Sequence, residues 1–469
     1  MYIQFLLCSN PKTMMPTLRR ILLACLAGLC ISATAETLPR RAFLGTQLLE
    51  VCDSLAALGK LPETGGVFVQ RVVEGSTAGA MGLEAGDIIW SANGKKPASV
   101  DGFVKDIQQL SAGDPIALKA YRNGSLLFLE GQVAGFPAET SPHARVIYDQ
   151  VPFEDGYART IIHAPHTEGK HPVFFFVQGY TCVSMDNMGE HSPVRKLLEG
   201  ISARGYVVVK TEKAGMGDSR SSRNCADINL FDEVGIFEAS YNALSKYDFV
   251  DLDNVFVFGH SMGGVQAPLM RTDFDPRGMI VFGTVARPWF EYLVEQTRKQ
   301  RLILGQDYLD NEAGHEQSIR FFYRFLIEKE KPEQLLQDPE MAEFMTRYWN
   351  WEEGGLLNGR HYTFWQQLQD TRPFTAWSKV NSYVLSLHGE GEYVAFNPYE
   401  HQLIADIVNT YNPGMATFLR VPNTDHAFLY VKDAAHSASI RNDAGYWRHN
   451  FNYSLVNLLV NWMEDHRRK

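Results

Sequence analysis

Hydrophobic and polar positions follow two different patterns along the chain. From about residue 42 to 133, short runs rich in branched and aromatic residues are separated by glycine turns, which is typical of β-strands. Within this region, "VDGFVKDIQQL" (100–110) instead places apolar residues at helical spacing. The pattern predicts a small β-rich domain with one amphipathic helix over residues 42–134.

A second pattern follows a stretch at 135–144 whose Pro, Ser and Gly residues show no period and indicate a linker. Apolar runs that predict strands include "PVFFFV", "YVVVK", "VFVF", "MIVF" and "YVLSL". Helical patterns lie between most of the later strands, at about 188–204, 229–246, 263–271, 397–410 and 444–465. Fully apolar strands joined by helices indicate a mostly parallel sheet covered on both faces, so residues 145–469 read as one α/β domain.

One insertion interrupts this alternation at about 286–378. It has helical patterning and dense aromatic residues, as in "RPWFEYL", "FFYRFL", "RYWNW" and "HYTFW", and it holds five of the eight Trp residues. The aromatic residues are expected either to form the core of a helical subdomain or to line an apolar substrate pocket beneath a helical lid, and one insertion can do both.

The first 35 residues have the layout of a cleavable export signal. "TLRR" supplies positive charge, "ILLACLAGLCIS" is a short apolar segment, and Ala33-Thr34-Ala35 offers small residues before Glu36. We expect cleavage after Ala35 and a periplasmic or secreted protein.

The net charge, the spacing of the histidines and one glycine-rich turn limit the kinds of ligand that the chain is expected to bind. The net charge is −10 and no basic run exists that could follow a phosphate backbone, so we expect no nucleic-acid partner. Close histidine pairs do not have zinc-ligand spacing, so neither a metal nor another cofactor is expected. "GMGDS" (215–219) lacks the lysine of a phosphate-binding loop, and we expect it instead to line the mouth of an active site.

The candidate nucleophile is Ser261, in Gly259-His260-Ser261-Met262-Gly263. The G-x-S-x-G pattern alone is short enough to arise by chance, but here it follows an apolar strand and precedes a helix. Small neighbours permit the strained turn that exposes a serine hydroxyl, and the amides of the helix N-terminus favour negative charge. The Met262 N–H is therefore predicted to be one oxyanion donor.

The remaining catalytic parts are expected in a fixed chain order. His426 in "VPNTDHAFL" follows the last strand and is the predicted general base. "HGEGE" follows the strand before it and offers Glu390 and Glu392, while Asp425 is expected to cap its own loop. "QGYTC" (178–182) follows an earlier strand, and the Tyr180 N–H is the predicted second oxyanion donor.

Export would leave Cys52, Cys182 and Cys225 in the processed chain, so at most one intrachain disulfide is expected. The loops that contain Cys182 and Cys225 leave neighbouring strands at the same edge of the sheet, which favours a bridge between them that would pin the oxyanion loop. The alternative is that all three are buried free thiols.

Together, "QGYTC", "EKAGMGDS", "GHSMGG", "HGEGE" and "TDHAF" resemble the α/β-hydrolase superfamily, with exported esterases and serine-aminopeptidase-like enzymes nearest. The N-terminal region, with "STAGA", "GDII" and "NG", resembles a bacterial PDZ domain. The implied fold is a mostly parallel α/β-hydrolase sheet with a helical lid insertion, preceded by the PDZ domain. The resemblance places the triad acid three residues after Gly389, at Glu392 in place of the usual Asp, with Glu390 as the alternative. Gln178 departs from the His-Gly that esterases often carry.

The resemblance implies hydrolysis of a small ester or acyl substrate through an acyl-enzyme. The main alternative is a serine peptidase acting on short peptides, in which acidic residues of the insertion (Glu291, Glu295, Glu352, Glu353) hold a terminal amine. Acyl transfer and a non-catalytic interaction protein are further alternatives.

PDZ domains bind the C-terminus of a peptide, and in this chain the binding loop is expected at Phe43-Leu44-Gly45. The alternative is that the domain acts only as a spacer.

Overall fold

A computed structural model gives the structure of residues 38–58, 61 and 64–469. The predicted export signal, residues 1–35, lies outside the described residues. Among the helices that are described, none combines the length and the hydrophobicity that crossing a bilayer requires.

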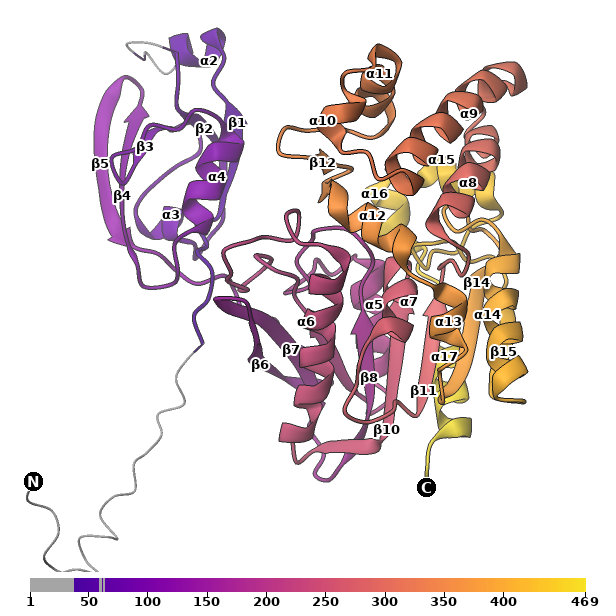
Figure 1. Cartoon of the computed structure of the whole chain (residues 1–469). Helices are drawn as coiled ribbons and strands as arrows, with labels where there is room; N and C mark the ends of the chain where they lie inside the picture. The colour runs from indigo at the N-terminus through magenta and orange to yellow at the C-terminus, as the bar shows by residue number, and fades with distance from the viewer. Residues whose placement is uncertain (1–37, 59–60, 62–63) are drawn as a thin grey trace, which may run out of the picture. The chain divides into compact units, whose positions relative to one another are not determined.

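The N-terminal sheet has five antiparallel strands in chain order (Figure 1). These are β1 (Thr46–Glu50), β2 (Val67–Val72), β3 (Ile88–Ala92), β4 (Pro115–Arg122) and β5 (Ser125–Gln132). Three helices accompany them: α2 (Asp53–Leu58), α3 (Thr77–Ala80) and α4 (Val100–Gln108). The helical spacing in "VDGFVKDIQQL" predicts most of the buried face of α4: Phe103 and Ile107 lie in the core of this domain, whereas Val104 is exposed.

The second sheet has eight strands, and the expected mostly parallel arrangement is confirmed. Its strands are β6 (Ala144–Phe153), β7 (Gly156–Pro165), β8 (His171–Val177), β9 (Val207–Thr211), β10 (Val250–His260), β11 (Gly278–Phe282), β14 (Tyr383–Gly389) and β15 (Ala416–Val421). In space their order is β15-β14-β11-β10-β8-β9-β7-β6. All neighbours from β9 to β15 are parallel, and β6 and β7 add an antiparallel hairpin at one edge.

Both faces of this sheet are buried, which explains why its strands are continuously apolar. On β8, Phe174 and Phe176 face one core and Phe175 faces the other, because successive side chains point to opposite faces. The first core is closed by α5 (Pro193–Ser202) and α17 (Ser454–His466). The second is closed by α6 (Leu230–Asn242), α14 (Pro398–Tyr411) and α13 (Pro373–Trp377).

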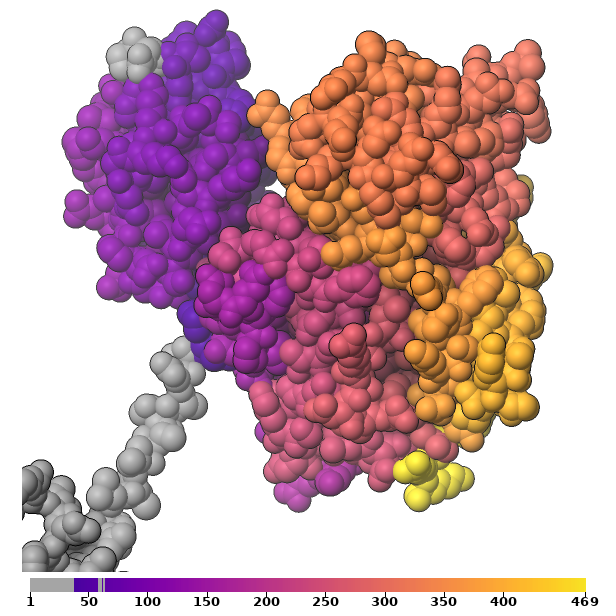
Figure 2. All heavy atoms as spheres, viewed as in Figure 1, coloured from indigo at the N-terminus to yellow at the C-terminus, as the bar shows by residue number. Residues whose placement is uncertain are grey.

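The insertion between β11 and β14 folds mainly as helices with a core of their own. It contains α8 (Trp289–Ile303), α9 (Tyr308–Phe322), α10 (Pro332–Leu335), α11 (Pro339–Tyr348), α12 (Tyr362–Asp370), α13, and a short hairpin of β12 (Leu356–Leu357) and β13 (Arg360–His361). In Figure 2, the salmon and light-orange atoms of the insertion form a continuous mass along the upper end of this domain. Helix α13 instead packs in the second core of the sheet, through Trp377.

Near the C-terminus the sequence suggests one helix, but the structure has two, α16 (Ala444–His449) and α17. Between them the backbone extends so that Phe451 bridges to Leu429 and the Asn452 N–H donates to the Phe428 carbonyl at 2.8 Å. Pairing with the segment that follows His426 thus interrupts the helical pattern. α15 (Ala434–Ile440) and α2 were not expected from the sequence.

Candidate active site

Ser261 lies at a sharp turn between β10 and α7 (Met262–Gln266), with φ 56° and ψ −122°. A positive φ is strained for a residue with a side chain, and such strain concentrates at functional sites. The turn requires small neighbours. A Cβ on Gly263 would lie 2.1 Å from the Val177 carbonyl oxygen, and one on Gly264 would lie 2.6 Å from the Thr284 Cβ.

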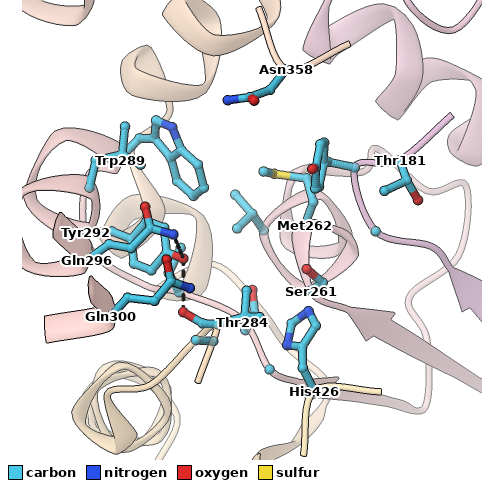
Figure 3. A pocket seen from close by; sticks show the side chains of 18 of the residues that line it. Thr181, Ser261, Met262, Thr284, Trp289, Tyr292, Gln296, Gln300, Asn358 and His426 are labelled. Atoms are coloured by element: carbon cyan, nitrogen blue, oxygen red, sulfur yellow. Dashed lines mark hydrogen bonds between the residues drawn. The ribbon is translucent and has the colours of Figure 1, made fainter. Parts of the chain in front are cut away.

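His426 and Glu392 are joined by a hydrogen bond. The His426 Nδ1–H donates to Glu392 Oε2 at 2.9 Å, and Glu392 Oε1 accepts the N–H groups of Val394 and Ala395 at 2.9 and 3.1 Å. Gly283 lies against the pair, where a Cβ would approach both side chains within 3 Å. Because Nδ1 donates to the carboxylate, Nε2 is left to act on the serine, and Figure 3 shows the imidazole beside the Ser261 hydroxyl.

Protonated His426 and ionised Glu392 stabilise each other, as their pKa shifts indicate. Burial alone would lower the pKa of His426, but the Glu392 carboxylate outweighs burial and raises it above the ordinary value. Burial alone would raise the pKa of Glu392, but the imidazole and the two backbone N–H groups lower it. Glu392 is therefore ionised at neutral pH and stabilises a protonated His426.

The other candidates for acid and base have different roles. Glu390 is exposed, and Asp425 accepts hydrogen bonds from the Ala427 and Leu429 N–H groups at 2.9 and 2.8 Å, as expected for a loop cap. His401 is buried, accepting from the Thr284 N–H at 3.2 Å and bonding to Ser386 Oγ at 2.9 Å. Of the candidate acids and bases, Glu392 and His426 are therefore the two that lie together beside Ser261.

His260 has a role that the sequence reasoning missed. Its Nε2 donates to the His426 backbone carbonyl at 2.8 Å, and its ring lies 4.9 Å from the His426 ring. Burial, together with His426, lowers the pKa of His260 to about 3, so the ring stays neutral. His260 therefore holds the loop of the candidate base, and its place directly before the serine was the signal that could have revealed it.

The two predicted oxyanion donors line the same cavity as Ser261. Within the described part of the chain, neither the Tyr180 N–H nor the Met262 N–H has a hydrogen-bond partner. Met262 is buried, whereas Tyr180 is exposed, and both N–H groups are left free to donate to a negative charge that develops at the serine.

A buried group of charged side chains fixes the loop that carries Tyr180. Lys213 Nζ donates to the Gly179 carbonyl at 2.6 Å, and Arg360 donates to the Tyr180 carbonyl at 2.8 Å. Glu233 pairs with both cations, at 2.9 and 2.7 Å. The Gly179 carbonyl and the Tyr180 N–H belong to one planar trans peptide, so Lys213 sets the direction in which that N–H points.

Cys182 and Cys225 form a disulfide, which ties the same loop to the segment after β9. The "GMGDS" turn does not line the cavity, contrary to expectation. Gly217 packs against Glu212, and Ser219 Oγ accepts the Arg159 N–H at 2.9 Å. The turn therefore has a structural role beside the site.

The cavity above Ser261 has a volume of about 790 Å³. Figure 3 shows Trp289, Tyr292, Gln296 and Gln300 of α8 on one wall, with Ser261 and Met262 on the other. Trp349 and Trp365 also line it while packing in the core of the insertion, so both interpretations of the aromatic residues hold. The acidic residues that a peptidase would need do not line it (Glu291, Glu295, Glu352, Glu353).

The predicted peptide-binding loop precedes β1, an edge strand that pairs only with β2 in its sheet. The Phe43 N–H is used internally, donating to the Ala134 carbonyl at 2.9 Å. The N–H groups of Leu44 and Gly45 have no partner among the described residues. Gly45 has φ +72°, and a Cβ there would lie 2.2 Å from the Ser76 Cβ.

Among the described residues, one cluster has metal-ligating residue types: Glu139 and His163, which are buried, and Glu199, which is half-buried. Lys210 Nζ already donates to both Glu139 oxygens, at 2.8 and 2.6 Å. The cluster thus holds an ammonium group as its cation, and we assign no metal to it.

Residues 43–132 match the family model described as PDZ domain. The chain is 34% identical over 99 residues to the "Probable periplasmic serine endoprotease DegP-like" of Chlamydia muridarum, which covers 21% of this chain and 20% of that protein. It is 32% identical over 88 residues to the periplasmic serine endoprotease DegP of Salmonella typhimurium, covering 19% and 18%. The chain thus spans about a fifth of the length of these curated relatives.

Among solved structures, Est1E from Butyrivibrio proteoclasticus is 16% identical with a TM-score of 0.40, covering 68% of this chain and 99% of that one. Acylaminoacyl peptidase of Pyrococcus horikoshii is 12% identical with a TM-score of 0.42, covering 76% and 48%. Neither neighbour identifies a substrate for this chain. The strand order of the second sheet and the serine turn after β10 are those of the α/β-hydrolase fold. The chain therefore consists of an N-terminal PDZ domain followed by a domain of the α/β-hydrolase fold.

Proposed function

We propose that the chain is an exported serine hydrolase that cleaves carboxylic esters through an acyl-enzyme. The observation that carries the proposal is the hydrogen bond from His426 Nδ1 to buried Glu392, with Ser261 beside the imidazole at a strained turn. In the first step His426 Nε2 takes the Ser261 proton, Oγ bonds to the acyl carbon, and the amides of Tyr180 and Met262 receive the oxyanion. His426 then returns the proton to the leaving alcohol, and water releases the acid in the same way.

The cavity favours an ester over an aminopeptidase substrate. An aminopeptidase holds a substrate ammonium group, which requires an anionic partner. No Asp or Glu lies among the described residues that line the cavity. Glu295, one of the candidate partners, is already engaged by Asn397 at 3.0 Å and by Arg287 and Lys299.

Export is supported by the disulfide and by the periplasmic relatives of the PDZ domain. Disulfides persist in oxidising compartments and are rare in the cytosol. The leader predicted over residues 1–35 would direct the protein there.

The test uses a fluorophosphonate probe on protein that begins at Glu36. We expect labelling that is lost in Ser261→Ala, with kcat reduced by a factor of about 10⁴ or more. Labelling that survives this change would refute the nucleophile. Turnover of nitrophenyl esters is then compared with turnover of aminoacyl nitroanilides, to determine whether the enzyme cleaves ester or amide bonds. Faster turnover of the amides would favour the peptidase.

A further inference from the structure

The cavity contains one unpaired cation that the proposed chemistry does not use. Arg301, near the C-terminal end of α8, lines the cavity, and its guanidinium lies over the Tyr348 ring at 4.9 Å. One of its terminal nitrogens donates to Ser318 Oγ at 3.3 Å. The other, Nη1, is buried beside Gly314 and has no hydrogen-bond partner among the described residues.

No carboxylate balances this charge. Arg301 forms no ion pair within the described residues, and the cavity lining contains neither Asp nor Glu. Burial lowers the pKa of Arg301, Tyr348 acts in the opposite direction, and no acidic side chain contributes. Arg301 is half-buried, and its Nη1 is shielded from solvent without a hydrogen-bond partner among the described residues, which favours an anion supplied from outside the chain.

The surroundings suit a polar anion at one end of an otherwise apolar cavity. Gln300 and Gln306, which flank Arg301 in sequence, both line the cavity. Helix α8 follows the loop after Glu392 along this wall of the cavity: the Tyr292 hydroxyl donates to the Val394 carbonyl and Gln300 Nε2 donates to the Tyr393 carbonyl, both at 3.1 Å. Arg301 directly follows Gln300 in α8 and lines the same cavity as Ser261.

We propose that Arg301 binds a carboxylate of the substrate, so that the enzyme prefers esters that carry an anionic group in addition to the scissile ester. This inference rests on the proposed ester hydrolysis and specifies its substrate class. The guanidinium donors can hold a carboxylate in a forked geometry, while the aromatic walls contact the apolar chain between the two ends.

The experiment compares nitrophenyl hexanoate with the mono-nitrophenyl ester of adipic acid, and also a longer matched pair. A second arm places the carboxylate on the leaving group, with phenyl and 4-carboxyphenyl butyrate. We expect the wild type to prefer the anionic member in at least one arm. Arg301→Gln should reduce the ratio of kcat/KM for anionic over neutral ester by about 10- to 100-fold, mainly through KM.

Two further variants make the result specific. Arg298→Gln removes the same charge from an exposed position on the same helix, outside the cavity lining, and should keep the wild-type ratio. Arg301→Lys should retain part of the preference, since it keeps the charge without the fork. An unchanged ratio in Arg301→Gln, or no anionic preference in either arm of the wild type, would overturn the proposal.

Failure of this inference is separable from failure of the proposed function. Loss of fluorophosphonate labelling and of turnover for every ester would contradict the hydrolase itself. Calorimetric binding of the adipate ester to Ser261→Ala protein needs no turnover, and it should weaken at least tenfold when Arg301→Gln is added. Equal binding by both proteins would refute the carboxylate site even if esters are hydrolysed.

Discussion

At the scale of single residues, the replacement of the usual Asp by Glu392 is explained by its contacts. The longer side chain reaches His426 while its other oxygen accepts two backbone N–H groups of its own loop. The carboxylate is thus fixed at both oxygens, which offsets the extra freedom of a glutamate.

The first prediction concerns Glu392→Gln. His426 must be neutral to accept the serine proton, so kcat/KM falls as the pH drops through its pKa. Glu392 raises that pKa, so its removal should move the acidic limb of the profile to lower pH. The plateau should fall by about 10³- to 10⁴-fold, because the imidazole also loses its orientation. The pH profile of nitrophenyl ester hydrolysis measures both effects.

Glu390→Gln is the matched control, since Glu390 is exposed and two residues away. It should change neither the plateau nor the acidic limb. A shifted limb in Glu390→Gln together with a normal one in Glu392→Gln would reassign the acid.

At the scale of elements, the loop after β8 is held from three directions, by Lys213, by Arg360 and by the disulfide. Lys213 comes from the segment after β9, and Arg360 comes from β13 of the insertion. The insertion therefore supports the candidate oxyanion loop as well as enclosing the cavity.

The second prediction is that Lys213→Met lowers kcat by about 10²- to 10³-fold with a small change in KM, because the peptide carrying the Tyr180 N–H loses its anchor. Lys210→Met is the control. Lys210 is also buried and ion-paired, with Glu139 at 2.6 Å, but it does not contact the loop. Melting temperatures should fall in both variants, since each removes one cationic partner from a buried carboxylate, leaving Glu233 with Arg360 alone and Glu139 with His163 alone. Equal losses of kcat would show that Lys213 acts only through stability.

The elements themselves were predictable because their signals are local. Fully apolar runs such as "VFVF" and "YVLSL" indicated buried parallel strands, and the residues after each strand supplied Ser261, Glu392 and His426. The pairing of Glu233 with both Lys213 and Arg360 could not be predicted, since these positions meet only after the insertion has folded.

The position of Arg301 in the cavity could not be predicted from the sequence either, although it depends on one helix alone. Arg298 and Arg301 lie three residues apart, yet one is exposed and the other lines the cavity. Charged residues occur on several sides of α8, so its sequence has no clear apolar stripe to show which arginine faces inward.

At the scale of the whole molecule, the hydrolase site draws no residue from the PDZ domain. Every described residue that lines the cavity lies at or beyond Phe176. Within the described residues, the PDZ domain leaves the N–H groups of Leu44 and Gly45 unpaired, and β1 pairs with no strand other than β2. Two binding events, one at each domain, should therefore be separable in one chain.

The third prediction is that the full processed chain binds an extended peptide through its C-terminal carboxylate, which the loop amides receive while the peptide adds a strand to β1. Amidation of the peptide should weaken binding at least tenfold in fluorescence polarisation, since the charge-assisted hydrogen bonds are lost. Gly45→Ala should weaken it too, because a side chain is strained at φ +72° and would meet Ser76. Protein inactivated at Ser261 by a fluorophosphonate should bind the peptide as tightly as untreated protein. If inactivation abolishes peptide binding, the peptide occupies the hydrolase cavity instead, and the peptidase alternative gains its first direct support.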